Sequence, residues 1–379
     1  MASSIERLNV APFEQSMLYL VLAENANRSG ANSDAHVKTA LKTATQIEDP
    51  IQAMECSFII AKTIASREAF SEDDLKQLQD AITQVRFDLE ALEGTSREYS
   101  TLWLTKYTTL LKCAAFYWKV GQQELADKYG ELAYSMTSLS SRGKSEISVF
   151  QAMTIFAMAG DVEQVTRFHH INSGRLNLLK RRNLAPFVSE LKKIKYKSLM
   201  NANLFVASKD NSADGGFHET LCQSMLAMTF ARAGDSDRTD VHYRKGNLMT
   251  SEYAQRLNSA TVKSQSHSLL AITEAHQEDY VSAKRRLKSL VENSGMLAEA
   301  ALEVGKVQLS SNDDSDQPDI DEVLELLAIF EDDPRATLLA FEIGQSYGKA
   351  NVDKAMAWAK GLSAAQKFAA NWGIVSSQP

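Results

Sequence analysis

The chain has 379 residues, of which 44% are hydrophobic and 23% are charged, and its formal net charge is −7. This composition supports an ordinary hydrophobic core, and the acidic balance argues against nucleic acid as a partner, because nucleic-acid-binding proteins usually carry a basic excess. Three cysteines without a CxxC pair argue against a disulfide framework or a cysteine-based zinc site, and they favour a reducing, cytoplasmic location.

The N-terminal residues predict an amphipathic helix rather than a signal peptide. Their apolar run, MLYLVLA, covers only seven residues, lies between Glu14 and Glu24, and follows no basic segment. No run of about 18 apolar residues occurs further along the chain, so we expect no membrane span.

Apolar residues recur along the chain with helical spacing. Within 51–65 a single helical stripe is formed by Ile51, Met54, Phe58, Ala61 and Ala65. Asp49-Pro50 and Asp333-Pro334 each place a side-chain acceptor before a proline, which is a signal for the start of a helix. Strand signals are scarce, since the sequence has no sustained apolar/polar alternation and no hairpin turn between β-branched runs. We therefore predict an all-α fold.

Two nearly identical hexapeptides, FAMAGD at 156–161 and FARAGD at 230–235, indicate a repeated unit. Each reads as a helix, a tight turn and a second helix, and the segment FYWKVGQQELADKYGELA at 116–133 follows the same pattern. The turn glycines are separated by 39 residues (160 − 121) and by 74 residues (234 − 160), which is twice 37. Because glycine at such a turn usually has a positive φ angle, we expect this of Gly121, Gly160 and Gly234. The period predicts stacked helical hairpins.

The unit around Gly121 resembles a degenerate tetratricopeptide repeat, because it keeps that motif's residues at their spacing: Leu110, Ala114, Tyr117, Gly121, Ala126 and Ala133. The unit around Gly234 has Thr239 where the motif has a small alanine, and the unit around Gly160 keeps only Phe156 and the glycine. All three units lack the closing proline. The resemblance covers about half of the chain and implies a right-handed α–α superhelix that binds proteins or peptides in its concave groove. Its consensus residues are packing residues, so no binding site carries over.

We predict a single helical-repeat array over residues 1–379, with about nine hairpins at 12–47, 50–92, 97–139, 145–172, 175–208, 217–250, 258–292, 296–331 and 334–375. The last hairpin contains a looser version of the repeat, with its turn at Ala350-Asn351. A polar, glycine-rich stretch at 208–216 predicts either a break between sub-arrays or an insertion between repeats, and an acidic stretch at 310–319 predicts a loop between repeats.

Three short motifs resemble functional sequences but lack residues that the chemistry needs. SLSSRGKS at 138–145 ends like a phosphate-binding loop, yet Ser138 replaces the first glycine and a helix precedes the motif. HETLC at 218–222 begins like a zinc-protease helix, but Cys222 replaces the second histidine. NDDSDQPDIDEV at 312–323 has glutamine and valine where a calcium-binding EF-hand loop needs glycine and glutamate. We therefore predict no catalytic residue, no cofactor and no metal.

One local charge feature is a candidate site for an anionic ligand or a partner. Residues 175–197 contain a single acid, Glu190, and eight basic residues: Arg175, Lys180, Arg181, Arg182, Lys192, Lys193, Lys195 and Lys197. Such a patch can attract an acidic peptide, a phosphate-bearing ligand, nucleic acid or an anionic membrane surface. The alternative interpretation is a solvated hairpin face that balances acidic neighbours.

The repeat pattern favours a non-catalytic scaffold, and not an enzyme, that binds a protein or peptide partner through its concave face. One alternative is a polyanion-binding protein that uses the basic patch. A further alternative is an enzyme whose active site is spread over several helices without a recognisable motif. The apolar C-terminal segment KFAANWGIV, which contains Trp372, also predicts self-association through this end, because terminal repeats usually present a polar outer face.

Overall fold

The computed structural model describes residues 2–67, 70–91, 101–136, 141–166, 213–257, 260–290, 294–311 and 320–378. Within these residues it contains seventeen helices and no strand, which confirms the all-α fold class. No helix in the described part of the chain combines the length and the apolarity needed to cross a membrane. The chain divides into two compact units: unit 1 combines Met1–Gly94 with Glu278–Pro379, and unit 2 is Thr95–Gln277.

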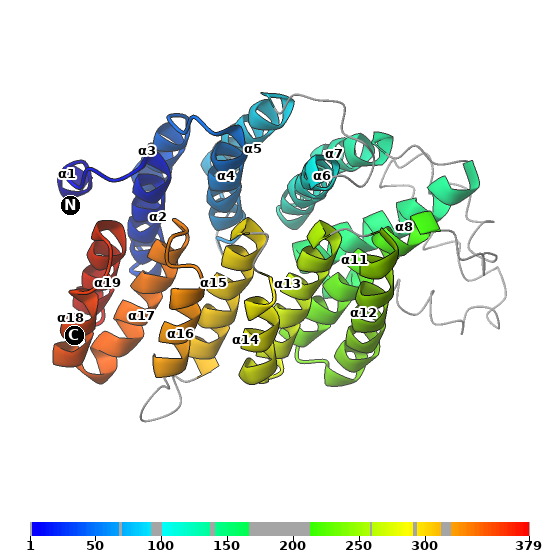
Figure 1. The fold of residues 1–379 in the computed structure, drawn as a ribbon. Coiled ribbons are helices and arrows are strands. Elements are labelled where there is room, and N and C mark those ends of the chain that lie inside the picture. The colour runs from blue at the N-terminus through cyan, green and yellow to red at the C-terminus, as the bar shows by residue number, and fades with distance from the viewer. Residues whose placement is uncertain are drawn as a thin grey trace. The chain divides into compact units, whose positions relative to one another are not determined.

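Consecutive helices pack as pairs, as the hairpin prediction expects (Figure 1). The pairs are α2 (Pro12–Arg28) with α3 (Asp34–Ala44), α4 (Pro50–Ala65) with α5 (Glu72–Ala91), α6 (Thr101–Lys119) with α7 (Gln123–Ser135), α11 (Ala213–Arg232) with α12 (Ser236–Leu257), and α15 (Ser294–Ser311) with α16 (Ile320–Ile329). The other helices are α1 (Ala2–Ile5), α8 (Ser141–Ala159), α13 (Ala260–His276), α14 (Tyr280–Lys288), α17 (Ala336–Ala350), α18 (Val352–Ala359) and α19 (Ala364–Ser376).

Some of the predicted features differ from the structure or lie outside the described residues. The hairpin predicted at 334–375 contains three helices rather than two, because α18 and α19 both follow α17. The hairpin predicted at 175–208 lies outside the described residues, as do 208–212 of the predicted break and 312–319 of the predicted acidic loop. The single array over 1–379 stays a prediction.

The repeated turns have the geometry that the glycines predict. Gly121, Gly160 and Gly234 have φ angles of 77°, 76° and 72°. After each glycine the next N–H donates to the carbonyl oxygen five residues earlier, as in Gln122 to Tyr117 at 2.8 Å and Asp235 to Phe230 at 2.9 Å. This bond and a second one from the glycine N–H form the Schellman motif, which satisfies the last carbonyl groups of the helix.

The structure adds two turns that the sequence analysis did not identify. Gly30, after α2, has a φ angle of 70°. Glu278, after α13, has a φ angle of 63° and is the only residue other than glycine with a positive φ in the described chain. It stands in EAHQED (274–279) at the position that glycine has in FARAGD, and Asp279 accepts the N–H of Ser282 at 3.1 Å. The turn between α13 and α14 therefore has a positive φ angle at the equivalent position without a glycine.

Of the two predicted helix starts, one is confirmed and one is corrected. Asp49 caps α4 and accepts the N–H of Ile51 at 2.8 Å, with Pro50 at the first helical position. Asp333-Pro334 instead forms a turn before α17, which begins two residues later at Ala336. Asn351 has an extended backbone, with a φ angle of −161°, and caps α18, so its turn differs from the glycine turns.

Unit 1 is built from both ends of the chain. Helix α2 packs against α17 and α19, so the first hairpin lies beside the last helices (Figure 1). Helices α17 and α19 approach each other closely. A Cβ atom added at Gly344 of α17 would lie only 2.3 Å from the carbonyl oxygen of Ala370 of α19. The segment that contains Trp372 packs against α17 within the unit, while its last residue, Val375, is 60% exposed. The self-association predicted for this end stays a prediction. In a linear repeat array each hairpin contacts only its neighbours, and unit 1 departs from that pattern.

Unit 2 packs α6, α8, α11, α12 and α13 around buried aromatic side chains. Helix α11 contacts α8, α12 and α13, and the hydroxyl of Thr229 on α11 donates to the carbonyl oxygen of Ala157 on α8 at 3.1 Å. Tyr107, Phe156 and Phe230 are among the largest fully buried side chains. The repeated hexapeptides thus supply the core of this unit, because Phe156 and Phe230 are their first residues.

Candidate functional site

The predicted basic patch lies in a part of the chain that the structure does not describe. All eight of its basic residues fall between 167 and 212, outside the described residues: Arg175, Lys180, Arg181, Arg182, Lys192, Lys193, Lys195 and Lys197. The patch stays a prediction, and the geometry of a candidate site must come from the described helices.

The motif HETLC is part of a buried aromatic cluster at the start of α11. The ring of His218 lies edge-on to Tyr107 at a centroid distance of 5.1 Å and to Trp103 at 6.3 Å. Burial lowers the pKa of His218 to about 3, so its imidazole is neutral at physiological pH. Cys222 is fully buried, and burial raises the pKa of its thiol. These two side chains contribute to packing, and no group of three or more His, Cys, Asp or Glu residues able to hold a metal ion occurs in the described chain.

The phosphate-loop-like motif is helical where the structure describes it. Gly143, Lys144 and Ser145 lie in the first turns of α8, and the preceding element is helix α7 rather than a strand. A helical backbone cannot curl around phosphates in the way that this loop requires. The EF-hand-like stretch lies outside the described residues up to 319, and its last residues begin helix α16.

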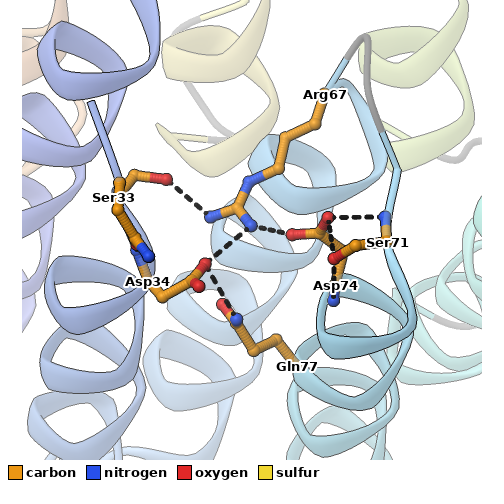
Figure 2. A network of polar contacts seen from close by, with 7 residues as sticks. Ser33, Asp34, Arg67, Ser71, Asp74 and Gln77 are labelled. Carbon is orange, nitrogen blue, oxygen red and sulfur yellow. Dashed lines mark hydrogen bonds and ion pairs between the residues drawn. The ribbon is translucent and has the colours of Figure 1, made fainter. Parts of the chain in front are cut away.

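Polar side chains gather instead where hairpins meet, and Arg67 is the centre of one such network (Figure 2). Arg67 follows the C-terminal end of α4, beside the N-terminal ends of α3 and α5. Helix α5 begins with a capping box: the N–H of Ser71 donates to Asp74 Oδ2 at 2.7 Å, and the N–H of Asp74 donates to Ser71 Oγ at 3.1 Å. The local sequence thus places a carboxylate beside the arginine.

The guanidinium of Arg67 connects three helices. Nη1 donates to Asp34 Oδ1 at 3.2 Å and also to Asp74 Oδ1, and Nη2 donates to Ser33 Oγ at 2.9 Å. The amide of Gln77 donates to Asp34 Oδ1 at 3.1 Å. The side chains of Arg67 and Asp74 are only 9% and 6% exposed, so this ion pair is shielded from water and from salt.

The charges of the Arg67 network favour a structural joint over a ligand site. The hydrogen bond from Gln77 is the largest cause of the lowered pKa of Asp34, and Arg67 lowers it further against the opposing effect of burial. Asp34 therefore faces the guanidinium in its charged form at neutral pH. An arginine that already contacts two carboxylates is poorly suited to bind an anion, so we interpret the network as the joint between the α2–α3 and α4–α5 hairpins.

A second buried arginine joins the two chain segments of unit 1. Arg335 is 3% exposed, and it donates to Glu55 of α4, to Asp333 Oδ2 at 3.0 Å and to the carbonyl oxygen of Gly295 at 3.0 Å. Its guanidinium also lies 5.8 Å from the centroid of the Phe13 ring of α2. Burial opposes its charge, but Glu55 and Asp333 outweigh that effect and raise the pKa of Arg335.

A third network lies between α2, α15 and α17. Arg28 donates to both carboxylate oxygens of Glu342, at 3.0 Å and 2.6 Å. Lys306 lies 3.2 Å from Glu342 and 3.5 Å from Glu24. Two cations and two anions balance within this cluster, and they again connect segments that are far apart in the sequence.

The described thiols are poor nucleophiles. Cys56, Cys113 and Cys222 are all free and buried. Burial raises the pKa of Cys56 and of Cys113 to about 12, so both remain protonated at neutral pH. Because the thiolate is the reactive form, these cysteines are suited to packing and not to covalent chemistry.

Sequence reasoning did not identify Arg67 or Arg335. The one available signal was the Ser71–Asp74 spacing, which matches the capping-box pattern before an apolar run. A scan against models of protein families finds no match for the chain. A search of curated proteins likewise returns no relative. The tetratricopeptide resemblance thus stays an interpretation of the sequence.

Proposed function

We propose that this protein is a non-catalytic helical-repeat scaffold, which binds a partner protein or peptide through the concave face of a tetratricopeptide-like superhelix. The observation that carries the proposal is the recurrence of one turn geometry after α2, α6, α8 and α11, where a glycine with a φ angle of 70° to 77° ends the helix. Repeated hairpins place equivalent helices in rows, and such rows suit the recognition of an extended partner segment.

The polar networks also support a scaffold. Each network of unit 1 pairs its own cations and anions across hairpin boundaries, as Arg67 does with Asp34 and Asp74. Networks of this kind hold helices that pack together in a defined orientation, which a preorganised binding surface requires. The proposal includes a cytoplasmic location, which is supported by the three free, buried cysteines.

A second candidate function rests on the charge of residues 175–197, which is +7 (eight basic residues and Glu190) in a chain of −7. In this alternative the patch binds a polyanion such as an acidic peptide, a phosphate-bearing ligand or nucleic acid. A third candidate, an enzyme with a dispersed active site, would need a cleft with converging titratable groups.

One affinity experiment separates these candidates. The full chain is used as bait in a lysate of its own host, beside a variant in which Lys192, Lys193, Lys195 and Lys197 are replaced by glutamine, and both are eluted with rising salt. Protein that stays bound to both baits at about 1 M salt, where charges are screened beyond about 3 Å, supports the scaffold. Ligands that leave at low salt and do not bind the variant favour the polyanion alternative. The absence of any ligand argues against both the scaffold and the polyanion alternative.

A further inference from the structure

Helix α18 leaves two large apolar side chains partly exposed beside its buried stripe. Ala355 and Ala359 are 0% exposed and pack in a cluster with Ala340, Ala370 and Ile374. Val352 and Met356, which lie one helical turn apart at the edge of this stripe, are 39% and 40% exposed. A short helix with two large exposed apolar side chains on one stripe is a candidate contact surface.

A third exposed apolar residue lies at the same end of the unit. Val375 of α19 is 60% exposed. The end of α19 packs against Gly348, since the Gln378 amide donates to the Gly348 carbonyl oxygen at 3.1 Å, and α18 begins four residues after Gly348. Val352, Met356 and Val375 are three of the eight exposed large hydrophobic residues in the described chain, so this end is enriched in them.

The charges beside Met356 indicate what covers this face. Asp353 in the first turn of α18 and Lys360, which follows its last residue, are both exposed. They are seven residues apart and therefore lie on the same side of the helix, with their midpoint between Met356 and Ala357. Neither forms an ion pair within the described residues. If two copies of α18 pair antiparallel around a twofold axis between Met356 and Ala357, Asp353 of each copy faces Lys360 of the other. The face is therefore complementary to itself in both charge and apolarity.

We propose that α18 is a homodimer contact, in which two copies of this chain pair antiparallel through Val352, Met356 and the reciprocal Asp353–Lys360 pairs. Such a contact is isologous, as in most twofold dimers. A pair of two-turn helices buries less than a standard interface of about 800 Å² per partner. The dimer is therefore weak and depends on protein concentration. This contact is independent of the proposed partner groove, and either can fail without the other.

Sedimentation velocity of the full chain over a range of concentrations tests the charge pairing. Asp353→Lys places two lysines against each other in both halves of the contact, and we expect the dissociation constant to rise by about tenfold or more. The double variant Asp353→Lys/Lys360→Asp restores both pairs in reversed order, so its dimerisation should return toward that of the original chain. A structural effect of Asp353→Lys on folding would not be reversed in this way.

Cysteine crosslinking tests the twofold axis. Because the natural cysteines are buried, Met356→Cys adds an exposed thiol, which under mild oxidation should form a disulfide with Met356→Cys of the second copy. Leu248→Cys on α12, where the side chain is 61% exposed, is the matched control and should crosslink much more slowly. A monomer at all concentrations, equal crosslinking of the two cysteine variants, or a different protein bound to α18 of a monomeric chain would each overturn the proposal.

Discussion

Arg67 and Arg335 are buried guanidinium groups, and each contacts two carboxylates that come from different parts of the fold. Their charges are costly to bury, and the ion pairs offset that cost only while every partner is in place. The stabilising effect of each arginine is therefore best seen when one partner is removed and another charge remains buried without compensation.

We expect Arg67→Ala to destabilise unit 1 by about 2 to 4 kcal/mol, because it leaves Asp34 and Asp74 without their cation. Urea denaturation followed by circular dichroism measures the loss. The matched control is Arg244→Ala, since Arg244 pairs with Asp240 at 3.5 Å but its side chain is 80% exposed. The control should change stability by less than about 0.5 kcal/mol, and equal effects of the two variants would contradict the structural role of Arg67.

Asp88 of α5 predicts a dependence of stability on pH. Its carboxylate is buried, Oδ1 accepts the amide of Gln84 at 2.9 Å, and Oδ2 has no hydrogen-bond partner. Burial raises the pKa of Asp88 above the unfolded value of about 3.9. The folded state therefore binds this proton more tightly than the unfolded state, and stability falls as the pH rises through the window between the two pKa values.

The variant Asp88→Asn, which mimics the protonated acid, isolates this effect. We expect the variant and the original chain to have similar stability at acidic pH, and the variant to become the more stable one as the pH rises to 7. Asp34→Asn should show the opposite trend, because the pKa of Asp34 is lowered and its charged form stabilises the fold. Parallel stability curves for Asp88→Asn and the original chain from pH 4 to 7 would rule out the proton linkage.

At the scale of elements, the turn that follows the first helix of a hairpin determines how the hairpin is formed. A Cβ atom added at Gly121, Gly160 or Gly234 would meet no atom within 4 Å, so these glycines are required by their positive φ angles and not by crowding. A residue with a side chain in the left-handed region costs about 1 kcal/mol or more. Glu278 carries that cost in the turn between α13 and α14.

We therefore expect opposite effects from two substitutions at equivalent positions. Gly234→Ala should destabilise the fold by about 1 kcal/mol, and Glu278→Gly should stabilise it by up to about 1 kcal/mol, as seen in urea denaturation midpoints. Gly361→Ala is the control, because Gly361 has no positive φ and its added Cβ would make only an ordinary contact at 3.6 Å. Stabilisation by both Gly234→Ala and Gly361→Ala would show that the turn conformation is not limiting.

The turns also show how much of the structure could be predicted from the sequence. Helices and glycine turns depend on residues within a few positions of each other, so FAMAGD and FARAGD predicted the helix before each turn and the φ angles at Gly160 and Gly234. The turn at Glu278 was not predicted, because glutamate, unlike glycine, gives no indication of a positive φ angle. Arg335 could not be found, because its partner Glu55 lies 280 residues away and no local pattern encodes that contact.

At the scale of the whole molecule, unit 1 depends on packing between the first and the last parts of the chain. Helix α2 contacts α17 and α19, while Glu55 and Arg335 pair across the same boundary. Neither segment buries its apolar face alone, so we infer that the two fold and unfold together. A linear array predicts the opposite, because there a local weakening spreads mainly to adjacent repeats.

Hydrogen exchange of Arg335→Ala distinguishes these two behaviours. The substitution removes the cation that contacts Glu55 and Asp333, and we expect the amides of α2 and α4 to lose protection together with those of α15 and α17, by about 10-fold or more in exchange rate. The amides of α11 in unit 2 serve as the internal control and should keep their protection. Loss of protection confined to α15 and α17 would show that the terminal segments are held together by contacts other than Arg335, since the N-terminal helices would then remain stable without it.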